Sequence, residues 1–142
     1  MRAQTDFENI SFKRGRNPKE VLGIGKRAQI KQWFEKWAPD AEYKIDDDFN
    51  IYVENYYLYL RNSKLTSLPD NLKSQGDLDL QNTNITSLPD NLKVGGYLNL
   101  NYTKITSLPD NLEVEGFLDI ENTKITSLPD NLKVGKYIYK DF

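Results

Sequence analysis

The chain has 142 residues, of which 38% are apolar and 28% charged, so its length and composition suit one globular domain with a buried core. It contains neither cysteine nor histidine, which excludes disulfides, thiolate zinc sites, cysteine nucleophiles and Ser-His-Asp catalysis. The net charge of -2 gives no global attraction to nucleic acid or lipid, and the sequence shows neither a signal-peptide pattern nor an apolar run long enough to cross a membrane.

Two short helices are expected near the start of the chain. Asn-Pro-Lys-Glu at 17–20 has the form of a helix start, and Gly-Ile-Gly at 23–25 is expected to end this first helix. A second helix is expected over 26–37, with Pro39 after it. Its spacing places one apolar stripe on the helix, made of Ile30, Trp33, Phe34 and Trp37.

Charge is unevenly distributed over this part of the chain. Residues 13–36 hold eight basic side chains against two acidic ones, and residues 40–54 hold six carboxylates against one lysine. One interpretation is a nucleic-acid contact on the second helix through Lys26, Arg27 and Lys31. The interpretation we favour is that the two runs neutralise each other, because charge runs are usually solvated faces.

The segment 46–60 is expected to turn twice. The aspartates at 46–48 lack the alternating ligands, the glycine and the distal glutamate of a calcium loop, so we expect an acidic turn, with no metal and no cofactor. Residues 49–53 alternate as a strand, and Glu54-Asn55 is expected to turn the chain back into 56–60 as a hairpin. Residues 1–56 are thus predicted to be an N-terminal helical and hairpin cap.

From residue 57 the chain repeats every 20 residues. The blocks are 57–76, 77–96, 97–116 and 117–136, followed by a partial block at 137–142, and Thr-Ser-Leu-Pro-Asp-Asn-Leu is identical in all four complete blocks. Leu98-Asn99-Leu100 alternates as a strand with both leucines inward, whereas Pro109 favours an extended return. Each block therefore predicts one coil of a β-rich solenoid over 57–142, with short parallel strands and an extended convex side.

The string L-x-L-x-x-T-x-I-T-S-L-P-D-N-L resembles the leucine-rich-repeat family. Its short LPxxL return is similar to the 20-residue repeats of bacterial type III secreted effectors and to leucine-rich-repeat proteins encoded by bacteriophages. A segment at 12–18, with Gly-Ile-Gly after it, is also similar to a stretch at the front of phage-encoded proteins. The ligase domain of some effectors, with its cysteine nucleophile, has no counterpart here. The sequence departs from the family where the ladder asparagine is replaced, at Ser63, Thr83, Thr103 and Thr123.

The residues that alternate with the inward leucines are expected to lie exposed on a concave face. There, aromatic side chains beside carboxylates would suit recognition of a protein. The alternative is that tyrosines simply favour strands and stack along the ladder. The candidate partner-binding residues are Tyr57, Tyr59, Arg61, Asp77, Asp79, Tyr97, Asn99, Phe117, Asp119, Tyr137 and Tyr139.

These features predict a protein-binding module that is not an enzyme, acting as an adaptor or inhibitor. The phage resemblance implies a host or defence protein as its target and a location in the host cytoplasm. Two alternatives remain open: nucleic-acid binding through the basic helix, and a structural or assembly role. The last strand, Tyr137-Ile138-Tyr139, has a free edge through which two copies could pair as a homodimer.

Overall fold

The computed structural model describes residues 18–142, so the segment at 12–17 and the cap residue Asn17 lie outside the described residues. The chain divides into two compact units, residues 1–39 and residues 40–142. The described part of the first unit is one helix, and the second unit contains all the described strands.

The helix α2 runs from Pro18 to Trp37 without a break. The expectation of two helices separated at Gly23 and Gly25 is therefore wrong. A glycine inside a helix costs only about 1 kcal/mol and keeps its backbone hydrogen bond, so two of them do not suffice to end one. The helix ends before Pro39, as expected, with a last hydrogen bond from the Ala38 amide to the Phe34 carbonyl at 2.8 Å.

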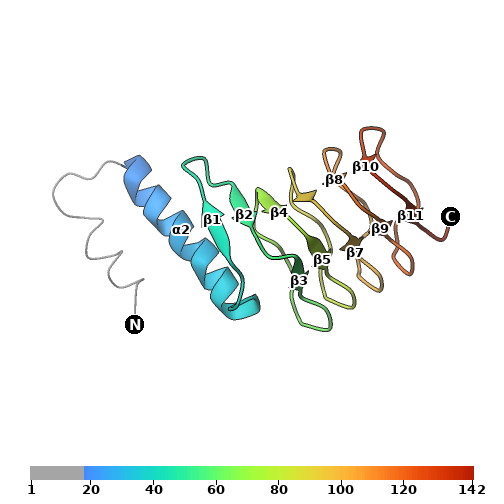
Figure 1. The fold of residues 1–142 in the computed structure, drawn as a ribbon, viewed down its shortest axis with the longest axis horizontal. Coiled ribbons are helices and arrows are strands. Elements are labelled where there is room, and N and C mark those ends of the chain that lie inside the picture. The colour runs from blue at the N-terminus through green and yellow to red at the C-terminus, as the bar shows by residue number, and fades with distance from the viewer. Residues whose placement is uncertain (1–17) are drawn as a thin grey trace. The chain divides into compact units, whose positions relative to one another are not determined.

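Residues 40–142 form a β-solenoid of about four turns, with two sheets of stacked short strands (Figure 1). The five-stranded sheet has the order β11-β9-β7-β5-β3 and is parallel throughout. Its strands are β3 (Tyr57–Tyr59), β5 (Asp77–Asp79), β7 (Leu98–Asn99), β9 (Leu118–Asp119) and β11 (Ile138–Tyr139). Pairs such as Leu58 with Leu78 keep the 20-residue register that the repeat predicts.

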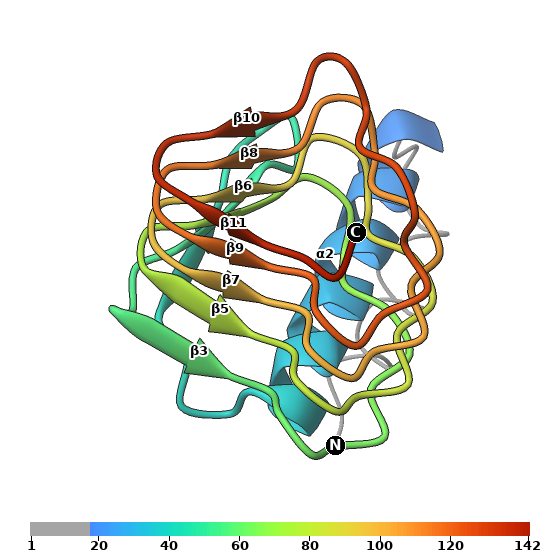
Figure 2. The same ribbon diagram turned by 90° about the vertical axis from the view of Figure 1, so that its right-hand side faces the viewer.

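The second sheet has six strands in the order β1-β2-β4-β6-β8-β10, and only its β1–β2 pair is antiparallel. Its strands are β1 (Tyr43–Ile45), β2 (Ile51–Val53), β4 (Leu72–Ser74), β6 (Lys93–Val94), β8 (Glu113–Val114) and β10 (Lys133–Val134). Its strands β4, β6, β8 and β10 lie at the ends of the return segments, which the sequence predicted to be extended; the pairing of these strands into a second sheet was not predicted. Each coil is thus a strand, a turn, an irregular return, a second strand and a corner, and successive coils superpose along the stack (Figure 2).

The hairpin lies elsewhere than predicted. Strand β2 alternates as expected, with Ile51 and Val53 buried and Tyr52 exposed, but it pairs with β1 and not with the strand that follows it. The intervening turn closes through a bond from the Asp46 amide to the Asn50 carbonyl, and the Asp46 carboxylate accepts the amides of Asp48 and Asn50. The chain then crosses to the other sheet as β3.

The leucines of the repeat form the core between the two sheets, as the alternation predicts. Leu78, Leu98 and Leu100 are fully buried, and so are their counterparts in the return segments, Ile85, Leu92, Ile105 and Leu112. The hydroxyls at positions 63, 83, 103 and 123 bond within their own coil. Those of Thr83 and Thr103 donate to the carbonyls three residues earlier, at 2.9 and 2.8 Å, so they brace the turn after each strand.

Candidate functional site: the outer face of the five-stranded sheet

Aromatic side chains gather on the outer face of the five-stranded sheet because they alternate with the buried leucines. Between 37% and 63% of the surface of five of them is exposed. These are Tyr57, Tyr59, Phe117, Tyr137 and Tyr139. Tyr97, in the middle of the sheet, is only partly exposed. The rings contact each other in groups: Tyr57 stacks on Tyr59 with ring centres 5.5 Å apart, and Tyr139 lies 5.0 Å from Tyr137 and 6.1 Å from Phe117.

The column of Asp79, Asn99 and Asp119 is buried, contrary to the expected exposure, with only 5–7% of each residue's surface accessible. Each side chain turns along its strand and accepts the backbone amide two residues ahead, at 2.9–3.0 Å. This is the turn-forming bond that aspartate and asparagine make readily. The side-chain oxygens of these three residues are therefore engaged in forming the turn and are less available to a partner.

The side chains at positions 61, 81 and 101, two residues further along each coil, bond to the following coil. Arg61 forms an ion pair with Asp79 in the following coil, with its Nε donating at 2.6 Å. The side-chain Nδ2 of Asn99 donates to Gln81 at 3.1 Å, and the side-chain Nδ2 of Asn101 donates to the Asp119 carboxylate at 3.0 Å. Arg61 therefore already compensates a buried carboxylate, although about half of its side chain remains exposed.

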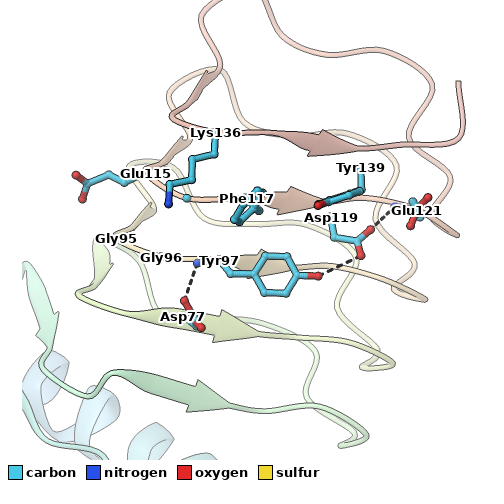
Figure 3. Close-up of a pocket in the computed structure, with 11 residues that line it drawn as sticks. Asp77, Gly95, Gly96, Tyr97, Glu115, Phe117, Asp119, Glu121, Lys136 and Tyr139 are labelled. Carbon is cyan, nitrogen blue, oxygen red and sulfur yellow. Dashed lines mark hydrogen bonds between the residues drawn. The ribbon is translucent and has the colours of Figure 1, made fainter.

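A hollow of about 600 Å³ opens between β7, β9 and β11 (Figure 3). The rings of Tyr97, Phe117 and Tyr139 lie along it, and Figure 3 shows Lys136 reaching toward Phe117 from the corner before β11. The Lys136 ammonium lies 5.4 Å from the centre of the Phe117 ring. The rest of the wall is made of Asp77, Gly95, Gly96, Glu115, Gly116, Asp119 and Glu121.

Tyr97 is fixed at both ends. Its amide donates to the Asp77 carboxylate at 2.8 Å and its hydroxyl donates to the Asp119 carboxylate at 3.2 Å. Partial burial, together with the charge of Asp119 and this bond, raises the pKa of Tyr97 well above its ordinary value of 10.0. A Cβ atom on Gly96 would lie 2.1 Å from the Asp77 carboxylate, so glycine at this corner leaves room for that bond.

The hollow carries negative charge. Four carboxylates line it, those of Asp77, Glu115, Asp119 and Glu121, against the single ammonium of Lys136. Asp119 accepts three hydrogen bonds, whereas the side chains of Glu115 and Glu121 enter no ion pair among the described residues.

The structure brings together only some of the predicted residues. The residues that line the hollow are Asp77, Tyr97, Phe117, Asp119 and Tyr139, and those that do not are Tyr57, Tyr59, Arg61, Asp79, Asn99 and Tyr137. The repeat pattern missed Glu115 and Lys136. Both stand at corner positions where other coils have glycine, at 95 and 135 for the first and at 76, 96 and 116 for the second. A departure from the repeat at a glycine position was the signal that could have found them.

The basic residues of the alternative hypothesis lie on α2, in the other unit. Lys26 and Lys31 are exposed there and Arg27 is partly exposed. Within residues 18–142 no group of three or more metal-binding side chains lies close enough to hold an ion. The helix α2, the one helix in that range, is not long and apolar enough to span a membrane.

Comparison with family models, with curated proteins and with solved structures finds no match to the chain.

Proposed function

We propose that this protein is a non-enzymatic binding module of the leucine-rich-repeat class that holds a protein target on the outer face of its five-stranded sheet. The observation that carries the proposal is the row of exposed aromatic rings beside carboxylates on this face. Aromatic residues are enriched at the energetic centres of protein interfaces. Because these strands hold the backbone and the rings contact one another, little conformational entropy would be lost on binding.

Within this proposal the protein is an adaptor or inhibitor, and residues 1–56 serve as the N-terminal cap that the sequence predicts. The phage-like repeats support a host or defence protein as target, and a chain without cysteine is compatible with a reducing cytoplasm. The lack of both cysteine and histidine in the sequence supports binding over catalysis.

Affinity capture from cells of the native host, read by mass spectrometry, tests the proposal. The double variant Phe117→Ala with Tyr139→Ala should lose a protein that the wild type retains. Tyr52→Ala is the matched control, because this tyrosine is as exposed as Tyr139 but lies on the six-stranded sheet. Retention of the same protein by the double variant, or its equal loss from the control, would show that the face is wrongly assigned.

Nucleic-acid binding remains the alternative because Lys26 and Lys31 are exposed on α2. Gel-shift binding that persists at physiological salt, and that is lost on changing both lysines to glutamate, would favour it. An assembly role through β11 would instead appear in light scattering as a mass that grows with concentration.

A further inference from the structure

We propose that the hollow between β7, β9 and β11 accepts an arginine side chain of the partner, with its guanidinium stacked on the aromatic rings and attracted by the surrounding carboxylates. This inference rests on the proposed function, since the arginine would belong to the protein held on the same face. It adds the chemistry of recognition: the face selects a basic segment.

The hollow combines aromatic rings with negative charge. Phe117 and Tyr139 present exposed ring surface beside four carboxylates and one ammonium. A cation is attracted both to the face of an aromatic ring and to the carboxylates beside it. Arginine suits such a site better than lysine, because its planar guanidinium stacks on rings and is more weakly hydrated.

A cation of the chain itself already lies at one of these rings. The Lys136 ammonium is 5.4 Å from the centre of the Phe117 ring, within the range of a cation–π contact. Lys136 is exposed and follows a corner, so its side chain can leave without disturbing the sheet. It acts as a placeholder that an arginine of higher affinity displaces.

The carboxylates of the hollow differ in their capacity to accept a ligand. Asp119 is buried and accepts bonds from Tyr97, from Asn101 and from the backbone, so it contributes its field but has little capacity for a ligand. Glu115 is exposed and Glu121 partly exposed, and neither enters an ion pair among residues 18–142. Figure 3 shows the two glutamates at opposite ends of the hollow, so we assign Glu115, at the Phe117 end, as the acceptor for the guanidinium, and Glu121 contributes only its charge.

The test is an NMR titration of the full chain with the peptide acetyl-Gly-Arg-Gly-amide, compared with the same peptide carrying citrulline. Citrulline has the shape of arginine but no charge. We expect the arginine peptide to shift the amide signals of 115–121 and 136–139. The citrulline peptide should leave them in place, and raising sodium chloride from about 20 to about 200 mM should weaken binding.

One variant is expected to bind the arginine peptide more tightly than the wild type, a result that partial unfolding could not produce. Lys136→Met keeps the apolar stem but removes the competing charge, so the arginine peptide should bind about threefold more tightly at low salt. Phe117→Leu and Glu115→Gln should each weaken binding about threefold. Tyr57→Leu, on the same sheet outside the hollow, should leave it unchanged.

Equal shifts with arginine and citrulline, no shifts with either, or no gain from Lys136→Met would overturn the inference. Binding of a neutral oligosaccharide such as maltohexaose at the same amides, without preference for arginine, would also overturn it and identify the rings as a sugar platform. Capture of a host protein that depends on Phe117 and Tyr139 would survive these outcomes, so a failure here is distinct from a failure of the proposed function.

Discussion

The hydroxyl of Tyr97 donates a hydrogen bond to the carboxylate of Asp119 at 3.2 Å, so a side chain of one coil is tied to a buried group of the next. The same bond fixes the ring along the wall of the hollow (Figure 3). Contacts of this kind hold the face in place in addition to the backbone ladder.

Changing Tyr97 to Phe removes this bond while the ring is kept. Asp119 retains two other donors, so we expect a loss of about 1 kcal/mol in the free energy of unfolding, measured by urea denaturation.

The stability of the wild type should also depend on pH through Tyr97. Because the pKa of Tyr97 is raised in the folded state, the unfolded chain releases this proton first, near its ordinary pKa of 10.0. The stability that the shift contributes is therefore complete below about pH 10 and falls as pH rises toward the folded-state pKa. Above pH 10 the wild type should lose stability more steeply than Tyr97→Phe, and parallel curves would contradict this expectation.

Tyr102 has a φ of 59°, in the left-handed region, at a turn position where three other coils have asparagine. The counterparts Asn62, Asn82 and Asn122 adopt the same φ, and asparagine tolerates it better than tyrosine. Tyr102→Asn should therefore raise the free energy of unfolding by roughly 0.5–1 kcal/mol, measured by thermal unfolding. Tyr56→Asn is the control, since Tyr56 is more exposed but has no positive φ. A lower melting temperature for Tyr102→Asn would show that the tyrosine stabilises the turn.

The buried hydroxyl of Thr103 donates to the Leu100 carbonyl at 2.8 Å. Thr103→Val keeps the shape but leaves this buried carbonyl with only the backbone amide of Thr103 as donor, so we expect a loss of about 0.5–1.5 kcal/mol. Thr103→Ser keeps the hydroxyl, and the first coil carries serine at this position, where Ser63 makes the same bond at 2.7 Å. The serine variant should lose less than the valine variant in chemical denaturation. The opposite order would mean that methyl packing, not the hydrogen bond, decides the stability of this turn.

Removal of β1 and β2 should impair folding of the repeats. Ile51 and Val53 are almost completely buried, and β2 covers the edge of β4 in parallel register. A fragment 57–142 would expose that edge and Leu72, whereas a fragment 40–142 keeps the whole second unit. We expect 40–142 to melt cooperatively and 57–142 to aggregate or to melt without cooperativity, as followed by circular dichroism. Equal melting of the two fragments would show that the repeats need no such cover.

Much of the solenoid could be predicted because its signal is periodic. A spacing of 20 residues and the alternation around Leu98 and Leu100 determine which side chains face inward, and the register follows from both. The six-stranded sheet was harder to predict because the proline of each return segment indicated an extended return, although Leu112 and Val114 are buried there in alternation as well. The partner of β2 depends on a contact between distant segments, since 43–45 and 57–59 both offer a strand of suitable alternation.

The site was predicted less completely, for reasons of side-chain geometry. Alternation places Asp79 and Asp119 on the outer face, but a short carboxylate can bend back to the backbone and become buried there. The hollow depends on Glu115 and Lys136, which break the repeat and so have no periodic signal. The aromatic rings were identified because each occupies a regular strand position.

Every coil between residues 57 and 136 carries the same heptapeptide and the same 20-residue register. A gene that lost or gained 60 nucleotides within this region would join one coil to another through an identical junction, with the ladder and the leucine core preserved. The hollow would not be preserved in the same way, because it is built from the residues in which the coils differ. The number of coils can therefore change by one at a time during evolution. Each such change would bring a different set of side chains together on the five-stranded sheet.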